Sequence, residues 1–144
     1  MLITLKLLQE KDACADGQKW FVDHFPEGGE YQTVLDAFAQ DNQSDYAQWL
    51  LNKMGGTSDV LELDEITGNN FFFAGSIRIK NGIVLTGALK IGSGIKAGDG
   101  HGIFAGLRVK INEWPIRAKV SAPIKPENLM TGFWDRGNGG QVGQ

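Results

Sequence analysis

Apolar residues recur every six positions between Phe71 and Val109. Written in sixes, this run reads FFFAGS, IRIKNG, IVLTGA, LKIGSG, IKAGDG, HGIFAG and LRV. The first and third positions of each unit are apolar except at His101, and the sixth position is always small. Two apolar residues one apart share a face of a strand, and a small residue after them permits a corner. The pattern predicts a hexapeptide β-solenoid.

The repeat run is short for a solenoid that stands alone. Its 39 residues make about two coils, whereas stacked repeats usually need about three units with capped ends. We therefore expect other parts of the chain to cover the two ends. An antiparallel β-meander or small barrel with evenly spaced turns is the alternative fold.

Helical patterns precede the repeats. Residues 2–8, LITLKLL, are apolar enough for a short strand. Asp12 is the expected N-cap of a first helix, whose apolar side carries Cys14, Gln18, Phe21 and Phe25. A second helix is expected from about Tyr31 to Gln40. A third helix is expected to be capped by Asn42 or Ser44 and to end at a glycine stop at Gly55-Gly56. The later segment DVLELDEI reads as a strand leading into the repeats.

The six-residue period fails after Val109. The following segment holds Trp114, prolines and the pair Phe133-Trp134, which we interpret as the cap of the open solenoid end or as an oligomer contact. The predicted class is α+β, with a strand and three helices over residues 1–56, packed on a β-solenoid with its cap over residues 57–134. Residues 135–144 lack an apolar pattern and are expected to form a flexible tail.

Charge is divided between the two parts of the chain. Through Ile66 there are 13 acidic against 4 basic residues, and from Thr67 onward 4 against 10, within an overall charge of −3. Such a split suggests two faces with different partners, or docking of one half on the other. No stretch has the length of a membrane span, and the N-terminus lacks the basic start of a secretory signal. We therefore expect a cytoplasmic protein, with no membrane partner.

Few residues suggest catalysis. His24 falls at the end of a predicted helix, and His101 has only Asp99 near it in sequence as a carboxylate to orient its ring. The glycines from Gly92 to Gly102 fit the corners of the repeat, and no Lys-Ser or Lys-Thr follows them as in a phosphate loop. The single cysteine and the scattered acids form no metal pattern. We expect no enzymatic activity, no metal and no cofactor.

Three sets of residues are candidates for binding. The acidic set could contact a protein partner and consists of Asp16, Asp23, Glu27, Glu30, Asp36, Asp41 and Asp45. A basic stripe for an anionic partner consists of Arg78, Lys80, Lys90, Lys96, Arg108 and Lys110. The expected oligomer contact consists of Trp114, Phe133 and Trp134. Few aromatic residues lie between the residues of the basic stripe, so no motif supports binding of a nucleic acid. Binding of a nucleotide remains an alternative.

Two stretches carry a resemblance. Residues 13–51, ACADGQKWFVDHFPEGGEYQTVLDAFAQDNQSDYAQWLL, resemble the N-terminal helical module of small phage and prophage proteins. Residues 87–109, GALKIGSGIKAGDGHGIFAGLRV, resemble the Gly-rich solenoids that follow this module in some of them. The resemblance implies an accessory phage product in the cytoplasm of the host bacterial cell, and blocking bacterial defence, as anti-CRISPR proteins do, is one common role of such products.

These patterns together favour a non-enzymatic protein, expected as a homo-oligomer, that binds and inhibits a host protein or protein complex. A structural component of the virion or of its assembly is an alternative. A sponge for an anionic nucleotide signal is another. The sequence leaves open the host factor, the handedness of the solenoid, the oligomeric state and which charged face binds.

Overall fold

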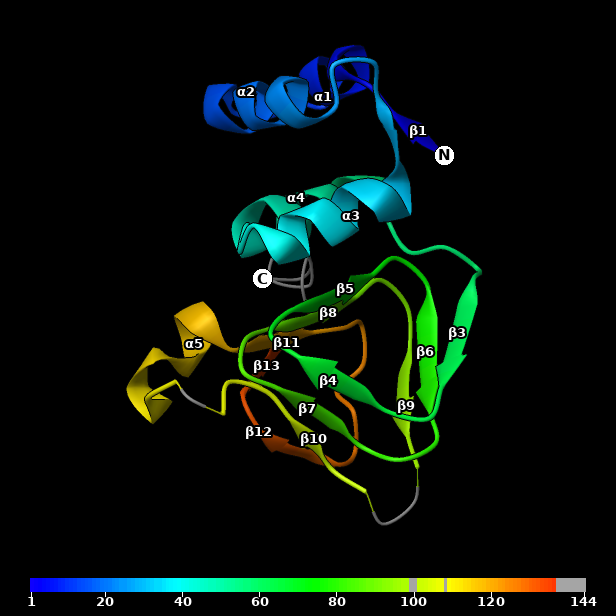
Figure 1. Ribbon diagram of the computed structural model, residues 1–144, viewed down its shortest axis with the longest axis vertical. Helices are drawn as coiled ribbons and strands as arrows, with labels where there is room; N and C mark the ends of the chain where they lie inside the picture. The colour runs from blue at the N-terminus through cyan, green and yellow to red at the C-terminus, as the bar shows by residue number, and fades with distance from the viewer. Residues whose placement is uncertain (99–100, 108, 137–144) are drawn as a thin grey trace.

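The computed structural model describes residues 1–98, 101–107 and 109–136, which form a helical part followed by a β-solenoid (Figure 1). The helices of the first part are α1 (Leu5–Glu10), α2 (Ala15–His24), α3 (Tyr31–Gln40) and α4 (Ser44–Met54). Strands β1 (Leu2–Ile3) and β2 (Gly29–Glu30) pair antiparallel beside them. Helices α1 and α2 form the outermost layer, and α3 and α4 lie between that layer and the solenoid.

The start of the chain differs from the prediction. The expected strand over residues 2–8 is wrong beyond Ile3, because Thr4 caps helix α1 by accepting a hydrogen bond from the Leu7 N–H at 3.1 Å. Asp12 is not the N-cap of the next helix: it has φ 64° in the turn, and α2 begins after Cys14, whose Sγ accepts from the Gly17 N–H. The predicted helix at Tyr31–Gln40 is present, and Gly55 ends α4 with φ 79°. The predicted cap of α4 is wrong, because Gln43 is its N-cap, Asn42 lies before it with φ 56°, and Ser44 is already helical.

Short parallel strands build the solenoid. They are β3 (Val60–Leu63), β4 (Ile66–Gly68), β5 (Phe71–Phe73), β6 (Ser76–Ile79), β7 (Ile83–Leu85), β8 (Leu89–Ile91), β9 (Ile95–Ala97), β10 (Ile103–Phe104), β11 (Lys119–Ser121), β12 (Leu129–Thr131) and β13 (Phe133–Asp135). Three sheets result, ordered β3-β6-β9, β12-β10-β7-β4 and β13-β11-β8-β5. These parallel pairings confirm the solenoid and exclude the antiparallel meander.

The six-residue period holds in the middle of the solenoid and then shifts. Paired residues such as Ile77 and Ile95 are 18 positions apart, which is three units of six. The next coil is two residues longer, since Ile103 pairs with Ile83. His101 therefore does not occupy an inward column, as the six-residue pattern had indicated. It is exposed, and Ile103, with no exposed surface, takes the inward position.

The solenoid is longer than the repeat run. After β10 the chain leaves it through a 3₁₀ turn (Ile111–Glu113) and helix α5 (Trp114–Arg117), and returns at β11. Strand β11 pairs with β8, β12 with β10, and β13 with β11, all parallel. The segment interpreted as a cap therefore contributes further coil. The insertion hides this from a periodicity search, because the paired Leu89 and Val120 are 31 residues apart.

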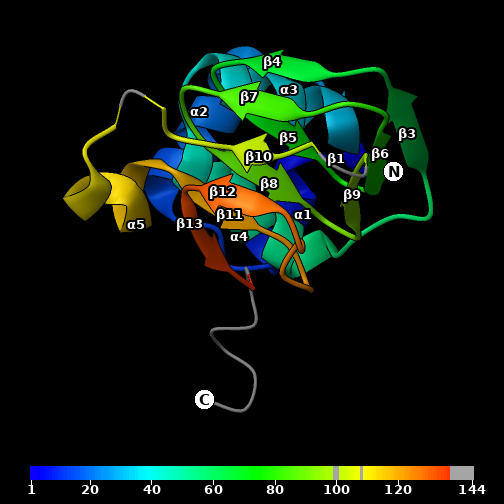
Figure 2. The same cartoon turned by 90° about the horizontal axis from the view of Figure 1, so that it is seen from below.

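Each side of the solenoid presents a different column of outward residues. The register aligns Glu62, Arg78 and Lys96 on the first sheet, which makes that face charged. It aligns Thr67, Val84 and Phe104 on the second, seen face on in Figure 2. On the third sheet the outward column is Phe72, Lys90, Ser121 and Asp135, and helices α3 and α4 cover this face.

Two groups of buried residues stabilise the fold. The inward residues of the strands form one core, in which Ile83, Leu89, Ile103 and Val120 have no exposed surface. The helices form the other core, which also includes Phe72, Ala74 and Ala88 from the solenoid. Because the helical core uses solenoid residues, the covered sheet belongs to both parts of the molecule.

Candidate functional site

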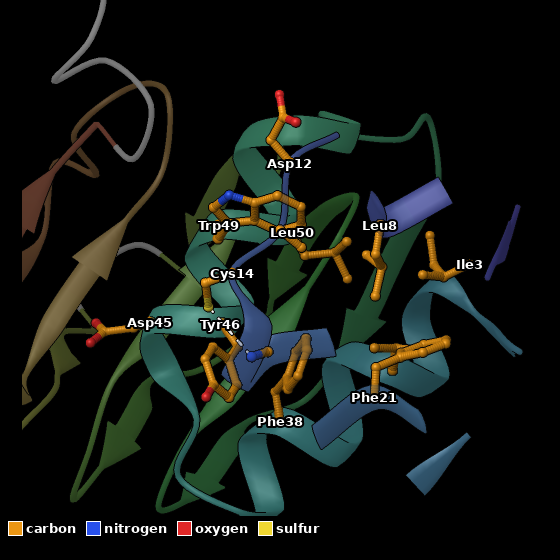
Figure 3. Close-up of a pocket in the computed structure, with 13 residues that line it drawn as sticks. Ile3, Leu8, Asp12, Cys14, Phe21, Phe38, Asp45, Tyr46, Trp49 and Leu50 are labelled. Atoms are coloured by element: carbon orange, nitrogen blue, oxygen red, sulfur yellow. Dashed lines mark hydrogen bonds between the residues drawn. The ribbon is translucent and has the colours of Figure 1, made fainter. Parts of the chain in front are cut away.

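A cavity of about 320 Å³ lies between the outer helical layer and the middle one. Figure 3 shows Phe21 of α2, Phe38 of α3 and Leu50 of α4 around this space, with Ile3 and Leu8 on one side of it. The volume is about twice that of the ~150 Å³ apolar cavities that bind benzene in an engineered protein. It lies at the low end of the roughly 300–1,000 Å³ range of ligand sites, so it suits one small apolar group.

The amphipathic helices explain why the cavity is apolar. Val34 and Phe38, one turn apart on α3, are buried in the helical core with Leu50 of α4. Aromatic rings continue the wall, with the Phe38 and Tyr46 ring centroids 5.9 Å apart. Small residues on the opposite side, Ala13 and Gly17, leave the space between the layers unfilled.

Polar groups gather beside the cavity. Cys14 and Asp12 come from the turn before α2, and Asp45 and Tyr46 come from the first turn of α4. In Figure 3 the carboxylates of Asp12 and Asp45 point away from the cavity. Burial, with smaller contributions from Cys14 and Asp16, raises the pKa of the Tyr46 hydroxyl, so this group stays protonated and neutral near pH 7.

The predicted acidic residues are all exposed, but they are not equivalent. Some have local partners: Asp23 forms an ion pair with Lys19 at 3.1 Å, and Glu30 with the N-terminal amine at 3.1 Å. Asp36 accepts a hydrogen bond from Gln32. Of the predicted set, Asp45 alone is among the described residues that line the cavity.

Asp41 has a structural role in joining helices. It accepts a hydrogen bond of 2.7 Å from Trp20 Nε1, and this bond and a second from Gln43 lower the pKa of its carboxyl group. The contact ties the turn after α3 to helix α2. Asp41 therefore stabilises the arrangement of the two helical layers around the cavity.

The predicted basic stripe is divided by the fold. Arg78, Lys80 and Lys96 share a face of the solenoid and line an open groove together with Glu62 and Asp64. Arg78 also forms a 3.6 Å ion pair with Glu62. Lys110 is exposed near the insertion, and Arg108 lies outside the described residues. Lys90 is separated from the stripe because its strand belongs to the sheet that the helices cover.

Lys90 instead lies in a buried polar network. Its Nζ donates to Gln48 Oε1 of α4 at 3.0 Å and to Ser121 Oγ at 3.4 Å. Ser121 donates in turn to Asp135, which is 3.7 Å from Lys119 Nζ. Burial is the main reason that the pKa of Lys90 falls to about 8. Lys90 and Ser121 are each 2% exposed, and the network joins helix α4 to the sheet that it covers.

The residues predicted for an oligomer contact are separated. Trp114 is half-buried, and its Nε1 donates to the Val109 carbonyl at 3.1 Å. Trp134 pairs with Val120 and so faces the solenoid interior, whereas Phe133 points outward and is 43% exposed. Phe133 thus remains a surface residue at the last coil.

The two histidines lie apart from the cavity. His24 stacks on Trp20 with ring centroids 4.0 Å apart, and its Nδ1 contacts the Trp20 carbonyl oxygen. Within residues 1–98, 101–107 and 109–136, no group of three or more His, Cys, Asp and Glu side chains could hold a metal ion. The same residues include no helix with the length and apolar character that crossing a membrane requires.

Fold and cavity together define an α+β protein in which a helical domain with an internal apolar site precedes a short parallel β-solenoid. Residues 1–57 match the family model of the YdhT N-terminal domain. All the residues that line the cavity lie within this segment. No curated protein matched the chain, and no solved structure did.

Sequence reasoning missed both the cavity and the Lys90 network. The cavity depends on the distance between the two helical layers, and a local sequence pattern does not predict this distance. Lys90 left a detectable signal, since it occupies an outward position within the apolar surroundings of Ala88, Leu89 and Ile91. Assigning each six-residue unit to a side of the solenoid would have placed Lys90 on the same face as Phe72.

Proposed function

We propose that the protein is a non-enzymatic binding protein that inhibits a host protein, and that its helical domain holds the binding site. The observation that carries the proposal is the apolar cavity inside the segment that matches the YdhT N-terminal domain. Components of bacterial defence are the first class of target to test, following the resemblance to phage accessory proteins.

The cavity is suited to an apolar anchor from the partner. Buried apolar side chains that enter a pre-formed pocket carry most of the energy of many interfaces. Here the walls come from packed helices, so little ordering is needed when an anchor enters. The polar groups beside the cavity, Asp12, Asp45 and Tyr46, can then contact the residues that flank this anchor.

Charge narrows the kind of partner. Residues 1–57 contain nine acidic and four basic residues, and two of these acids, Asp12 and Asp45, border the cavity. Opposite charge across an interface speeds association and favours the correct orientation. We therefore expect the partner segment to carry an apolar side chain with a lysine or arginine next to it.

The test fills the cavity without changing the outer surface. Ala13 lines the cavity and packs against the helical core, whereas Ala15 is exposed on the same turn of the chain. Tagged wild-type protein, Ala13→Leu and Ala15→Leu are used in parallel to capture proteins from bacterial lysate, with mass spectrometry as the readout. A true partner is retained by wild type and Ala15→Leu, and its recovery with Ala13→Leu falls at least tenfold.

Folding of the filled variant is checked by thermal unfolding. Filling an apolar cavity keeps or raises the melting temperature, so a folded Ala13→Leu that loses its partner supports the site. A partner that binds all three proteins equally would show that the binding surface lies outside the helical domain.

A second candidate function follows from the charged face of the solenoid. Arg78, Lys80 and Lys96 line a groove of about 720 Å³, which can hold an anion such as a nucleotide. Native mass spectrometry of the purified protein would show a retained nucleotide, and Arg78→Glu with Lys96→Glu would abolish its retention. Lys53→Glu, on helix α4, is the control and leaves retention unchanged.

A further inference from the structure

At the first end of the solenoid, a side chain from the helical part covers the edge of strand β5. Gln32 Nε2 of α3 donates to the Phe72 carbonyl at 2.8 Å, and Gln32 Oε1 accepts from the Ala74 N–H at 3.0 Å. A neighbouring parallel strand would use the same two backbone groups. The side-chain amide thus replaces a peptide group and ends the sheet at β5.

At the last end of the solenoid, one edge of β13 has no partner strand among the described residues. In β13 the Phe133 N–H donates to Ala118 and the Asp135 carbonyl accepts from Ala122, both toward β11. Backbone groups alternate along a strand, so those of Trp134, between these two residues, face the outer edge. No described strand pairs with β13 or β12 on that side. Such an edge is a ready template for another strand.

Exposed apolar side chains surround this edge. In the last coil Ile124 is 81% exposed, Met130 62% and Phe133 43%. The indole Nε1 of Trp134 is buried, and it has no hydrogen-bond partner among the described residues. Exposed apolar side chains in the same coil as a free strand edge are typical of an interface.

We propose that a second copy of this chain binds here, so that the protein is a twofold dimer joined through the last coils, with the two β13 edges paired antiparallel. Two identical edges can pair with each other about a twofold axis, and the same patch then serves both protomers. Residues 123–128 carry Lys125 and Glu127, both exposed and of opposite sign. A twofold axis allows Lys125 of one protomer to face the partner's Glu127.

Other occupants fit this end less well. Residues 137–144, GNGGQVGQ, include a single apolar residue, Val142, so this segment offers too little apolar surface to cover Ile124, Met130 and Phe133. Head-to-tail stacking would place this edge against the first coil, where Gln32 already occupies the β5 edge. A second copy related by a twofold axis uses the open end alone.

The test is the mass of the full chain in solution, measured by sedimentation and light scattering over a range of concentrations. Wild type is expected at about twice its 15.7 kDa chain mass. The variant Met130→Lys with Phe133→Lys is expected at the monomer mass, because both side chains are exposed and the substitutions leave the core intact. The matched control, Ile111→Lys with Ile116→Lys, changes residues that are 73% and 77% exposed on the insertion, and remains dimeric.

Three results would overturn the dimer. Wild type could remain a monomer at its highest soluble concentration, or the control pair could dissociate the dimer while the Met130 and Phe133 pair does not. Growth into species larger than a dimer would show a head-to-tail contact instead. A variant lacking residues 137–144 should stay dimeric, and its dissociation would assign the contact to that segment. Ala13→Leu should also dimerise, which separates this proposal from the proposed function.

Discussion

Lys90 is the residue at which the helical layer most changes the chemistry of the solenoid. Arg78 and Lys96 occupy equivalent outward positions on an uncovered sheet and are exposed, whereas Lys90 is 2% exposed beneath α4. Burial disfavours the charged form and outweighs the attraction of Asp135, which is why the pKa of Lys90 falls to about 8 from 10.5. Keeping the Lys90 ammonium group charged in the folded protein therefore lowers the free energy of unfolding.

Replacing Lys90 by methionine should stabilise the protein near neutral pH. A pKa lowered by that amount corresponds to about 3 kcal/mol, from which the lost hydrogen bonds to Gln48 and Ser121 subtract. We expect Lys90→Met to raise the free energy of unfolding at pH 7 by about 1–2 kcal/mol, measured with urea. A destabilised variant would show that the hydrogen bonds outweigh the cost of burial.

The pH dependence gives an independent check on Lys90. Between pH 8 and 10.5 the unfolded chain keeps the Lys90 proton while the folded chain loses it, so wild-type stability rises with pH in this window. The Lys90→Met variant lacks this rise, and its advantage should shrink from pH 8 toward pH 10. Burial raises the pKa of Tyr31 in both proteins, so the difference between them isolates Lys90.

Single residues of the first two helices also show what the sequence pattern could and could not predict. Cys14, Phe21 and Phe25 were placed on one helix face, and Phe21 is buried with Phe25 packed beside it. The pattern could not show that Cys14 caps that helix, since cysteine is an uncommon N-cap. Nor could it separate helix from strand over residues 5–8, because a short apolar run fits both.

At the scale of the element, the unit is a coil of three strands and three corners. The six-residue pattern predicted strands β5 to β9 because the coils there have no insertions. The pattern gives the wrong register at β10, because the coil there has two extra residues. It does not detect β11 to β13, because the insertion with α5 separates these strands from the repeats. Periodicity detects stacking only while successive coils have equal length.

Corner glycines set how closely coils stack, and Gly92 tests this directly. A Cβ added to Gly92 would clash with the Ala74 carbonyl oxygen of the preceding coil, whereas one added to Gly94 would meet only Ser76 Oγ at 3.6 Å. Gly92→Ala should lower the free energy of unfolding by about 2 kcal/mol or more, because backbone must move. Gly94→Ala, in the same corner, should change it by less than about 0.5 kcal/mol. Equal effects in thermal unfolding would contradict this account.

At the scale of the whole molecule, the two parts share a sheet. Phe72, buried to 2% exposure, belongs to the helical core although it lies on a solenoid strand. Deleting the helices would therefore expose an apolar face and free the β5 edge. A truncation that leaves residues 58–144 is not a neutral way to locate a binding site.

Unfolding should consequently be a single cooperative event. We expect the most protected amides of α3 and α4 to exchange with the same opening free energy as those of β5 and β8, because each pair of elements buries the other. Hydrogen exchange read by mass spectrometry measures both sets in one experiment. Helical amides that open at an energy at least 2 kcal/mol lower would identify two independent domains.

The sequence could predict both parts of the molecule and their order, since each has its own periodicity. It could not predict that α3 and α4 lie on the sheet that contains Phe72 and Lys90, or that a cavity separates the helical layers. Those features depend on distances between elements far apart in the chain, such as the 40 residues between Gln32 and Phe72.

The closure of the first coil by Gln32 also bears on how the chain acquires its fold during synthesis. Residues of α3 leave the ribosome before the strands do, so Gln32 is already available to pair when Phe72 and Ala74 emerge. The first coil then has a partner to pair with immediately, and each later coil forms on the one before it. We expect α3 in this way to set where the solenoid begins and the register of its first coil.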